Sequence, residues 1–145
     1  MTITFRPACI PDKYSEPFFS SACIGHLVYQ RCKICDAPQL GRALCEQCGS
    51  LDLLWHEASG KAKIHSFTVM HLAYHPSFKI GDYFSAIVEL EEGVRLPVYA
   101  GARDEWGSMQ VGDDVVVGFE EGEQGVMLPK LSRFIGSDVL PSAYD

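Results

Sequence analysis

Two Cys-x2-Cys pairs separated by nine residues constrain the fold of this chain more than any other feature. The first pair is Cys32 and Cys35, and the second is Cys45 and Cys48. Each pair can form a tight turn that directs two sulfurs at one point. A short hairpin between the pairs can then close a tetrahedral site around zinc, with Zn–S distances of about 2.3 Å. A closed site of four thiolates leaves no coordination position for water. The spacing therefore predicts Zn²⁺ in a structural role, bound by all four cysteines.

Disulfides, a redox-active pair and unrelated buried thiols are the alternatives for these cysteines. The first thirty residues contain Asp12, Lys13 and Glu16 and lack a basic start followed by an apolar stretch, so no export signal supports disulfides. A redox-active pair is expected at the start of a helix, whereas both pairs here flank a short polar loop. We therefore expect a metal site and a cytoplasmic location.

Two further cysteines, Cys9 and Cys23, fall outside this spacing. Cys23 is predicted to be a buried thiol on a helix, and Cys9 has no predicted role. Neither is predicted to be a nucleophile, because no paired histidine is in view.

The charge and the length exclude several classes of protein. Twelve Lys and Arg residues against nineteen Asp and Glu residues give a net charge of -7, and four thiolates with one zinc ion would add two further negative charges. Such an acidic chain is a poor candidate for binding nucleic acid. No apolar stretch approaches the roughly 20 residues that cross a bilayer. We therefore expect neither nucleic acid nor a membrane as a partner, and a length of 145 residues suits one ordinary domain, or a small one with a metal-held appendage.

An irregular arm and a short helix are expected before the cysteines. Residues 1–12 show no periodicity, and a helix is predicted over residues 15–25, ended by Gly25. Its apolar side chains share one face: Phe18, Phe19, Ala22 and Cys23. The arm and the helix together form the first predicted unit, residues 1–25.

The two cysteine pairs lie between two predicted strands, residues 26–31 and 51–57. In the second strand Leu51, Leu53 and Trp55 alternate on one side. A ribbon of about 30 residues cannot bury a sufficient core, which is the physical reason for a metal. The prediction is a rubredoxin-like zinc ribbon over residues 26–58.

From Ser59 onward, alternating apolar segments and turn signals predict an all-β unit over residues 59–136, followed by a tail over 137–145. Five strands are expected, over residues 61–74, 83–90, 94–102, 114–120 and 126–134. Hairpin loops are predicted at residues 91–93 and 121–125, and a turn at residues 111–113. A long first strand, a meander and a closing strand are what an OB-fold barrel requires. The inward-facing side chains would be Ile64, Phe84 or Ile87, Val88, Leu96, Val115 and Val117.

Five stretches of the chain resemble one family. They are residues 27–35 (LVYQRCKIC), 45–50 (CEQCGS), 55–62 (WHEASGKA), 64–71 (IHSFTVMH) and 87–96 (IVELEEGVRL). In this order, between a short helix and a barrel, they resemble the DUF35 family of zinc-ribbon and OB-fold proteins associated with acyl-CoA enzymes. The resemblance covers residues 15–134 and implies the mainly β fold described above.

The resemblance also implies a function. Family members are accessory subunits of thiolase-like enzymes, which carry the acyl group on their own cysteine, so no catalytic residue of the family can be carried onto this chain. The implied role is a noncatalytic scaffold of a multicomponent C-acyltransferase, in a hetero-oligomer with thiolase-like and ketosynthase-like subunits. The implied reaction is acetyl transfer to a phloroglucinol-type phenolic acceptor in antibiotic biosynthesis.

Two alternatives remain open. The chain could be an accessory acyl-CoA-binding subunit of another thiolase or aldolase, with Arg42, Lys61 and Lys63 as candidates to contact the CoA phosphates. It could also bind single-stranded nucleic acid, as OB barrels and zinc ribbons do elsewhere. That surface would gather basic and aromatic side chains at one barrel edge: Lys61, Lys63, Lys130 and Arg133 beside Phe67 or Phe134.

If this chain were a catalyst by itself, its candidate catalytic residues would be three histidines and an aspartate: His65, His71, His75 and Asp82. A general base could be drawn from this set. His65 and His71 share a face of one strand only if no bulge intervenes, so satisfied sheet or surface histidines are favoured.

Apolar side chains in loops are candidates for docking a partner. The predicted loop over residues 74–82 contains Phe78 and Ile80, and a later segment contains Trp106. For each, the alternative is that the side chain folds back on the barrel. Residues 139–141 near the end of the chain raise the same expectation of a partner surface.

Overall fold

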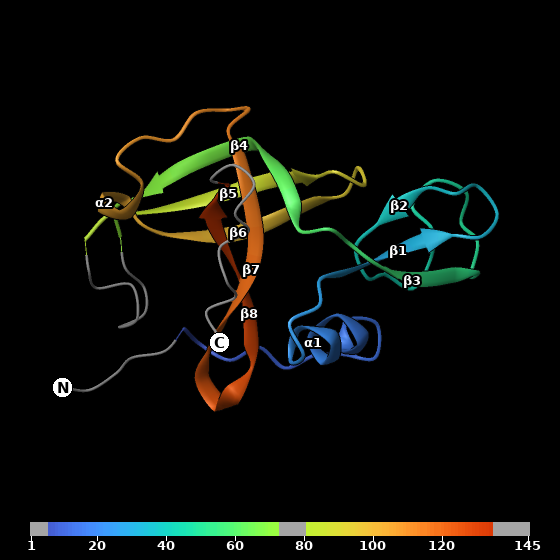
Figure 1. Cartoon of the computed structure of the whole chain (residues 1–145). Helices are drawn as coiled ribbons and strands as arrows, with labels where there is room; N and C mark the ends of the chain where they lie inside the picture. The colour runs from blue at the N-terminus through green and yellow to red at the C-terminus, as the bar shows by residue number, and fades with distance from the viewer. Residues whose placement is uncertain (1–5, 73–80, 135–145) are drawn as a thin grey trace.

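A short helix, a three-stranded sheet and a closed five-stranded barrel follow one another along the chain (Figure 1). The computed structural model describes residues 6–72 and 81–134. The helix is α1 (Glu16–Ala22), and the small sheet contains β1 (Val28–Cys32), β2 (Pro38–Gln39) and β3 (Leu53–Glu57). The barrel strands are β4 (Lys61–Met70), β5 (Tyr83–Leu90), β6 (Arg95–Ala102), β7 (Asp114–Glu121) and β8 (Met127–Arg133). The predicted mainly β class, with a helix ahead of an OB-fold barrel, is confirmed.

The helix is shorter than the predicted range and buries a narrower face. Phe18 and Ala22, four residues apart, are its buried side chains. Cys23 follows the last helical residue and is exposed, so the prediction of a buried thiol was wrong. Cys23 lies about 100° around the helix axis from Ala22, and that rotation turns its thiol away from the core.

The three-stranded sheet, which we call the ribbon sheet, has the order β2-β1-β3. β1 and β3 are antiparallel, with Gln30 opposite Trp55. Both strands begin two residues later than predicted, and β1 ends at Cys32. Leu51 lies before β3 and is 78% exposed, so its predicted place in the strand was wrong. The two-residue strand β2 had no predicted counterpart.

The barrel closes in the order β4-β5-β6-β8-β7. The predicted hairpins join β5 to β6 and β7 to β8, and both pairs of strands are antiparallel. β4 pairs with both β5 and β7, as the OB-fold requires. β4 ends at Met70, which pairs with Tyr83, the first residue of β5, so the predicted extension through residues 71–72 was wrong. A register shift interrupts the β4–β5 pairing between Ile64 and Ser66.

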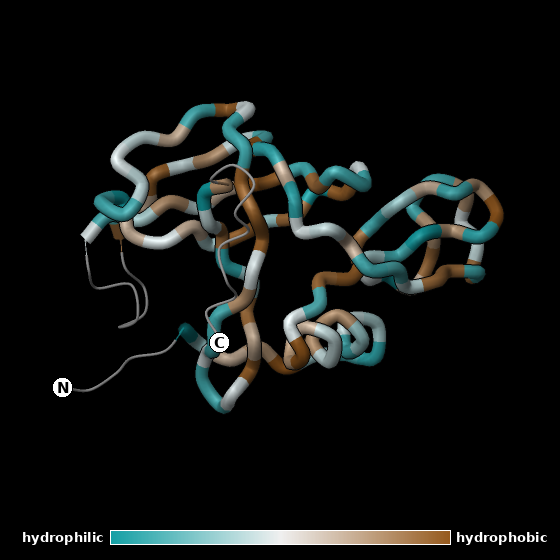
Figure 2. The backbone as a smooth tube through the Cα atoms, viewed as in Figure 1, coloured by the Kyte–Doolittle hydropathy of each residue, from teal (hydrophilic) through white to brown (hydrophobic). Residues whose placement is uncertain are grey.

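One hydrophobic core fills the barrel and continues to the helix and the ribbon sheet. The inward-facing side chains are those predicted, with Phe84 buried and Ile87 39% exposed: Ile64, Phe84, Val88, Leu96, Val115 and Val117. Phe18 of α1 packs edge-on against Phe119 of β7, with ring centroids 6.2 Å apart. Leu27 belongs to the same cluster, and Figure 2 shows an apolar stretch where the chain passes from α1 into β1.

The predictions for His75, Phe78, Ile80, the tail over 137–145 and its residues 139–141 concern positions outside the described residues. In the part of the chain that the structure describes, no helix is long and apolar enough to cross a membrane.

Candidate metal centre

The four predicted cysteines meet at one end of the ribbon sheet. Their sulfur atoms all lie within 4.8 Å of one another. The closest sulfurs belong to different pairs: Cys32 Sγ is 3.6 Å from Cys48 Sγ, and Cys35 Sγ is 3.5 Å from Cys45 Sγ. A tetrahedral site with Zn–S distances of about 2.3 Å places neighbouring sulfurs about 3.8 Å apart, whereas a disulfide brings them to about 2.05 Å. The donor set and its spacing therefore fit a metal ion and not disulfides.

Each cysteine pair sits in the same backbone turn. Cys32 and Cys45, the first members, are buried, and Cys35 and Cys48 are exposed. In each turn the backbone N–H two residues after the first cysteine donates to its sulfur at 3.4 Å, from Ile34 in one turn and from Gln47 in the other. These bonds stabilise the thiolate form that binds metals.

The residue after each pair adopts a left-handed conformation. Asp36 has φ 62° and Gly49 has φ 75°. Their backbone N–H groups donate to the carbonyl oxygens of Cys32 and Cys45, both at 3.0 Å. The two turns are thus copies of one geometry, although one uses glycine and the other aspartate. Asp36 also accepts bonds from Arg31 through its backbone and side chain.

The four thiols differ in acidity. Backbone N–H donation at Cys48 lowers the pKa of Cys45 to about 6, and further donation from Gln47 acts in the same direction. Backbone donation at Cys35 likewise lowers the pKa of Cys32. The backbone at Ala37 acts to lower the pKa of Cys35, but desolvation and the neighbouring sulfurs outweigh it and raise that pKa to about 12. Four sulfurs this close cannot all ionise without a cation, which is what a divalent metal supplies.

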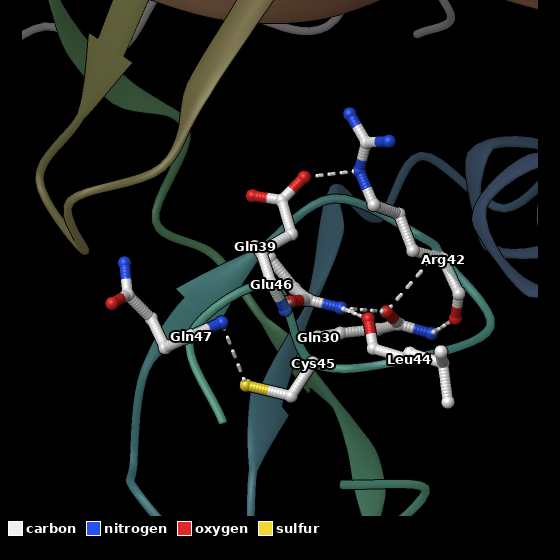
Figure 3. A network of polar contacts seen from close by, with 7 residues as sticks. All are labelled: Gln30, Gln39, Arg42, Leu44, Cys45, Glu46 and Gln47. Carbon is white, nitrogen blue, oxygen red and sulfur yellow. Dashed lines mark hydrogen bonds and ion pairs between the residues drawn. The ribbon is translucent and has the colours of Figure 1, made fainter. Parts of the chain in front are cut away.

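Two buried glutamines hold the loop between the cysteine pairs (Figure 3). Gln30 and Gln39 are each only 4% exposed. Gln39 Nε2 donates to Gln30 Oε1 and to the Leu44 carbonyl, both at 3.0 Å, and Gln39 Oε1 accepts from the Glu46 N–H at 2.9 Å. Gln30 Oε1 also accepts from the Arg42 N–H at 2.9 Å, while its Nε2 donates to the Arg42 carbonyl.

This amide network places Cys45 opposite the first pair, and sequence reasoning missed it. The available signal was weak: strand alternation puts Gln30 on the same side of β1 as Cys32.

Comparisons with known proteins identify the family of this chain. A family model described as the ChsH2 C-terminal OB-fold domain matches residues 55–120. A DUF35 domain-containing scaffold protein of Methanothermobacter thermautotrophicus is 39% identical, over 59% of this chain and 68% of that protein. This chain belongs to the DUF35 family. A second DUF35 domain-containing scaffold protein, from Methanocaldococcus jannaschii, is 35% identical over 48% of this chain and 51% of its own length.

Two solved structures extend the DUF35 comparison to three dimensions. A chain of the Ltp2-ChsH2(DUF35) aldolase is similar with a TM-score of 0.72 and 32% identity, and the match covers 87% of this chain and 97% of that one. A DUF35 protein of unknown function from Sulfolobus solfataricus has a TM-score of 0.60 and 18% identity, covering 83% of this chain and 86% of that one, which supports the fold alone.

Among the candidate catalytic residues that the structure describes in this DUF35 chain, only His71 and Asp82 lie together, and His65 is apart from them. The register shift in β4 falls at His65, and His71 lies beyond the end of that strand. His71 Nδ1 is 3.0 Å from Asp82 Oδ1 in an exposed pair, and Asp82 also faces Arg103 at 3.6 Å. These two histidines are therefore separate surface side chains, as favoured from the sequence.

The basic candidates of the barrel are mostly engaged with neighbouring groups. Lys63 Nζ lies 2.6 Å from Asp114, and Lys130 Nζ lies 3.6 Å from Glu120. Arg133 donates to the backbone carbonyls of the segment around Trp106 and stacks on that ring, 4.9 Å from its centroid. Of the predicted basic surface, Lys63 and Lys130 are therefore paired with carboxylates, and the Arg133 guanidinium is held by neutral groups.

A groove of about 560 Å³ at one barrel edge contains Lys61 and Lys63, but Glu89, Glu91 and Asp114 line it as well. Arg42, the other phosphate candidate, is paired with Glu46. The acidic neighbours of these three basic side chains would oppose the binding of phosphate groups.

Trp106 was predicted either to dock a partner or to fold back on the barrel, and the structure distinguishes the two. It lies in the one-turn helix α2 (Arg103–Trp106), is 7% exposed, and its Nε1 donates to the Ala100 carbonyl at 2.6 Å. The side chain thus folds back on the barrel and is not available to a partner.

Proposed function

We propose that this chain is a noncatalytic scaffold subunit of a multicomponent C-acyltransferase, bridging thiolase-like and ketosynthase-like subunits in a hetero-oligomer. The observation that carries the proposal is the likeness to a DUF35 chain of the Ltp2-ChsH2(DUF35) aldolase, 97% of which this chain matches. That protein combines a DUF35 component with a second one, Ltp2. The two methanogen relatives, both described as scaffold proteins, support the same role.

The metal in this proposal is Zn²⁺, held by Cys32, Cys35, Cys45 and Cys48. All four thiolates are used as ligands, so the ion stabilises the ribbon and activates no water. In residues 6–72 and 81–134, those cysteines are the only group of His, Cys, Asp or Glu side chains close enough to hold a metal. The acyl-carrying nucleophile would then belong to a thiolase-like partner, inside the cytoplasm.

The specific reaction we propose is acetyl transfer to a phloroglucinol-type phenol in antibiotic biosynthesis. Its support is the resemblance of the quoted sequence stretches to the small B subunit of the bacterial three-component phloroglucinol acetyltransferase. The likeness to an aldolase chain favours one other candidate, an accessory subunit of an aldolase.

Co-expression with candidate thiolase-like and ketosynthase-like subunits tests the scaffold role. We expect a stable complex that transfers acetyl groups to phloroglucinol, and loss of both assembly and activity when this chain is omitted. Carbon-carbon bond cleavage without acetyl transfer would identify the aldolase alternative. Acyl transfer by this chain alone, or full activity and assembly of the partners without it, would refute the scaffold proposal.

The zinc assignment is tested by Cys32→Ser. We expect elemental analysis to show loss of about one zinc ion per chain, together with loss of complex formation. Cys23→Ser is the matched control, because its thiol is exposed and lies outside the cluster. Full zinc content in the Cys32→Ser variant would contradict the ligand assignment.

A further inference from the structure

β3 forms one edge of the ribbon sheet. The sheet order is β2-β1-β3, and in Figure 1 β3 runs along the side of the sheet opposite β2. Among the described residues, β1 is the only strand that pairs with β3. An edge strand presents a row of backbone N–H and C=O groups that another strand can bind.

The register of the sheet identifies which groups face outward. The N–H of Ala58 donates to the Leu27 carbonyl, and the N–H of Lys33 donates to the Asp52 carbonyl, both at 2.8 Å. Hydrogen-bonded pairs alternate along an antiparallel ladder. The groups of Leu54 and His56 therefore point toward β1.

By the same alternation, the backbone groups of Leu53, Trp55 and Glu57 point away from β1. The Leu53 N–H donates to the Leu51 carbonyl oxygen at 3.0 Å. In the described parts of the chain, no hydrogen bond satisfies the outward N–H and C=O of Trp55 and Glu57 or the C=O of Leu53. Three acceptors and two donors are thus arranged along one free edge.

Apolar and acidic side chains are exposed along this edge. Leu51 and Leu54 are 78% and 45% exposed. Asp52, which lies between these two leucines, and Glu57 are exposed as well, and residues 51–58 contain no Lys or Arg. Glu57 lies 3.1 Å from His26, itself half exposed.

We propose that the free edge of β3 binds an extended segment of the thiolase-like partner as a fourth strand of the ribbon sheet. The segment pairs with Trp55 and Glu57 through its backbone, places an apolar residue beside Leu54, and carries Lys or Arg near its ends to face Asp52 and Glu57. A second copy of this chain fits less well, because antiparallel pairing about Trp55 would gather the acids of both copies at each end. This inference rests on the proposed scaffold role.

Amide hydrogen exchange of the full chain, alone and in the co-expressed complex, tests the edge directly. We expect the amides of Trp55 and Glu57 to exchange fast in the isolated chain and at least about tenfold more slowly in the complex. The His56 amide, which faces β1, should be slow in both. Protection of Trp55 and Glu57 that grows with the concentration of the isolated chain would mean pairing between copies and would overturn the proposal.

Glu57→Pro is the matching variant. It removes the outward N–H together with the carboxylate, at the kind of edge position where strands accept proline. We expect partner binding to weaken at least about tenfold with zinc retained, while Glu57→Gln, which keeps the N–H, should bind within about threefold of the unmodified chain. If Glu57→Pro loses zinc, the exchange measurement on the unmodified chain decides.

The two proposals fail differently. The edge proposal is refuted if the complex forms while the amides of Trp55 and Glu57 still exchange fast, or if the Glu57→Pro variant binds the partner normally. Either result leaves the scaffold role unaffected. Failure of the full chain to bind any thiolase-like subunit would remove both.

Discussion

Asp36 and Gly49 occupy equivalent left-handed positions after the two cysteine pairs, but they tolerate that backbone for different reasons. Asp36 combines its positive φ with hydrogen bonds to Arg31. Gly49 has no Cβ, and a Cβ built there would meet no atom within 4 Å. Replacement of Gly49 is therefore limited by backbone strain and not by space.

Gly49→Val should lower the free energy of unfolding by about 1–2 kcal/mol, because a β-branched residue is strained at positive φ. Gly49→Asn should lose less, since asparagine visits this region more readily. Urea unfolding of the metal-loaded chain measures both. Equal midpoints for the two variants would argue against the strain.

Gln39 makes three hydrogen bonds in the loop network. Without its amide group, the partner groups would be left without a hydrogen bond. Gln39→Leu should lower the free energy of unfolding by about 1–3 kcal/mol, because the Glu46 N–H and the Leu44 carbonyl lose their partner. Gln47→Leu is the control, since that side chain is exposed on the same loop. Thermal unfolding of the two variants gives the comparison, and a Gln39→Leu variant as stable as the control would contradict the network's role.

At the scale of elements, the loop before the second cysteine pair is packed tightly against β3. A Cβ added at Gly41 would lie 2.7 Å from the Trp55 ring and 2.7 Å from the Tyr14 carbonyl oxygen. The glycine lets the ribbon sheet, the loop and the segment before α1 approach one another.

Gly41→Ala should therefore destabilise the protein by about 1–3 kcal/mol through overpacking. Gly118→Ala is the matched control, because its Cβ would only meet the Lys130 carbonyl at 3.9 Å. Chemical unfolding followed by tryptophan fluorescence would report the difference. A Gly41→Ala variant no less stable than Gly118→Ala would show that the loop yields to the added methyl group.

The long elements were predictable and the short ones were not. Alternation along residues 83–90 matches β5, including its bounds. By contrast, β2 and α2 have only two and four residues, too few for a periodic pattern. α2 is held by the hydrogen bond from Trp106 to the Ala100 carbonyl, and no local sequence pattern predicts that bond.

At the scale of the whole molecule, the ribbon sheet and the barrel draw on different sources of stability. The barrel closes on itself around buried side chains such as Ile64, Val88 and Val115. The ribbon sheet contributes Tyr29 to the shared core, and Leu27 joins it from just before β1. At the other end of the sheet the four cysteine sulfurs cluster instead.

Removal of the metal with a strong chelator should therefore unfold the ribbon first. We expect the amides of β1 and β3 to lose protection from hydrogen exchange while those of β5 and β6 keep it. Acid should act in the same direction, because protons compete with the metal for the thiolates. Retained protection in β1 and β3 without metal would show that packing alone holds the ribbon.

The order of helix, ribbon and barrel, the four candidate ligands and the inward face of the barrel all followed from the residues in their order. Ligand spacing and strand alternation are local properties, so a linear sequence carries them. The exposure of Cys23, the break at His65, the bonds between Gln30 and Gln39 and the open edge of β3 followed only from the fold. Each depends on which distant segments meet and in what register, because burial and hydrogen bonding are set by neighbours in space.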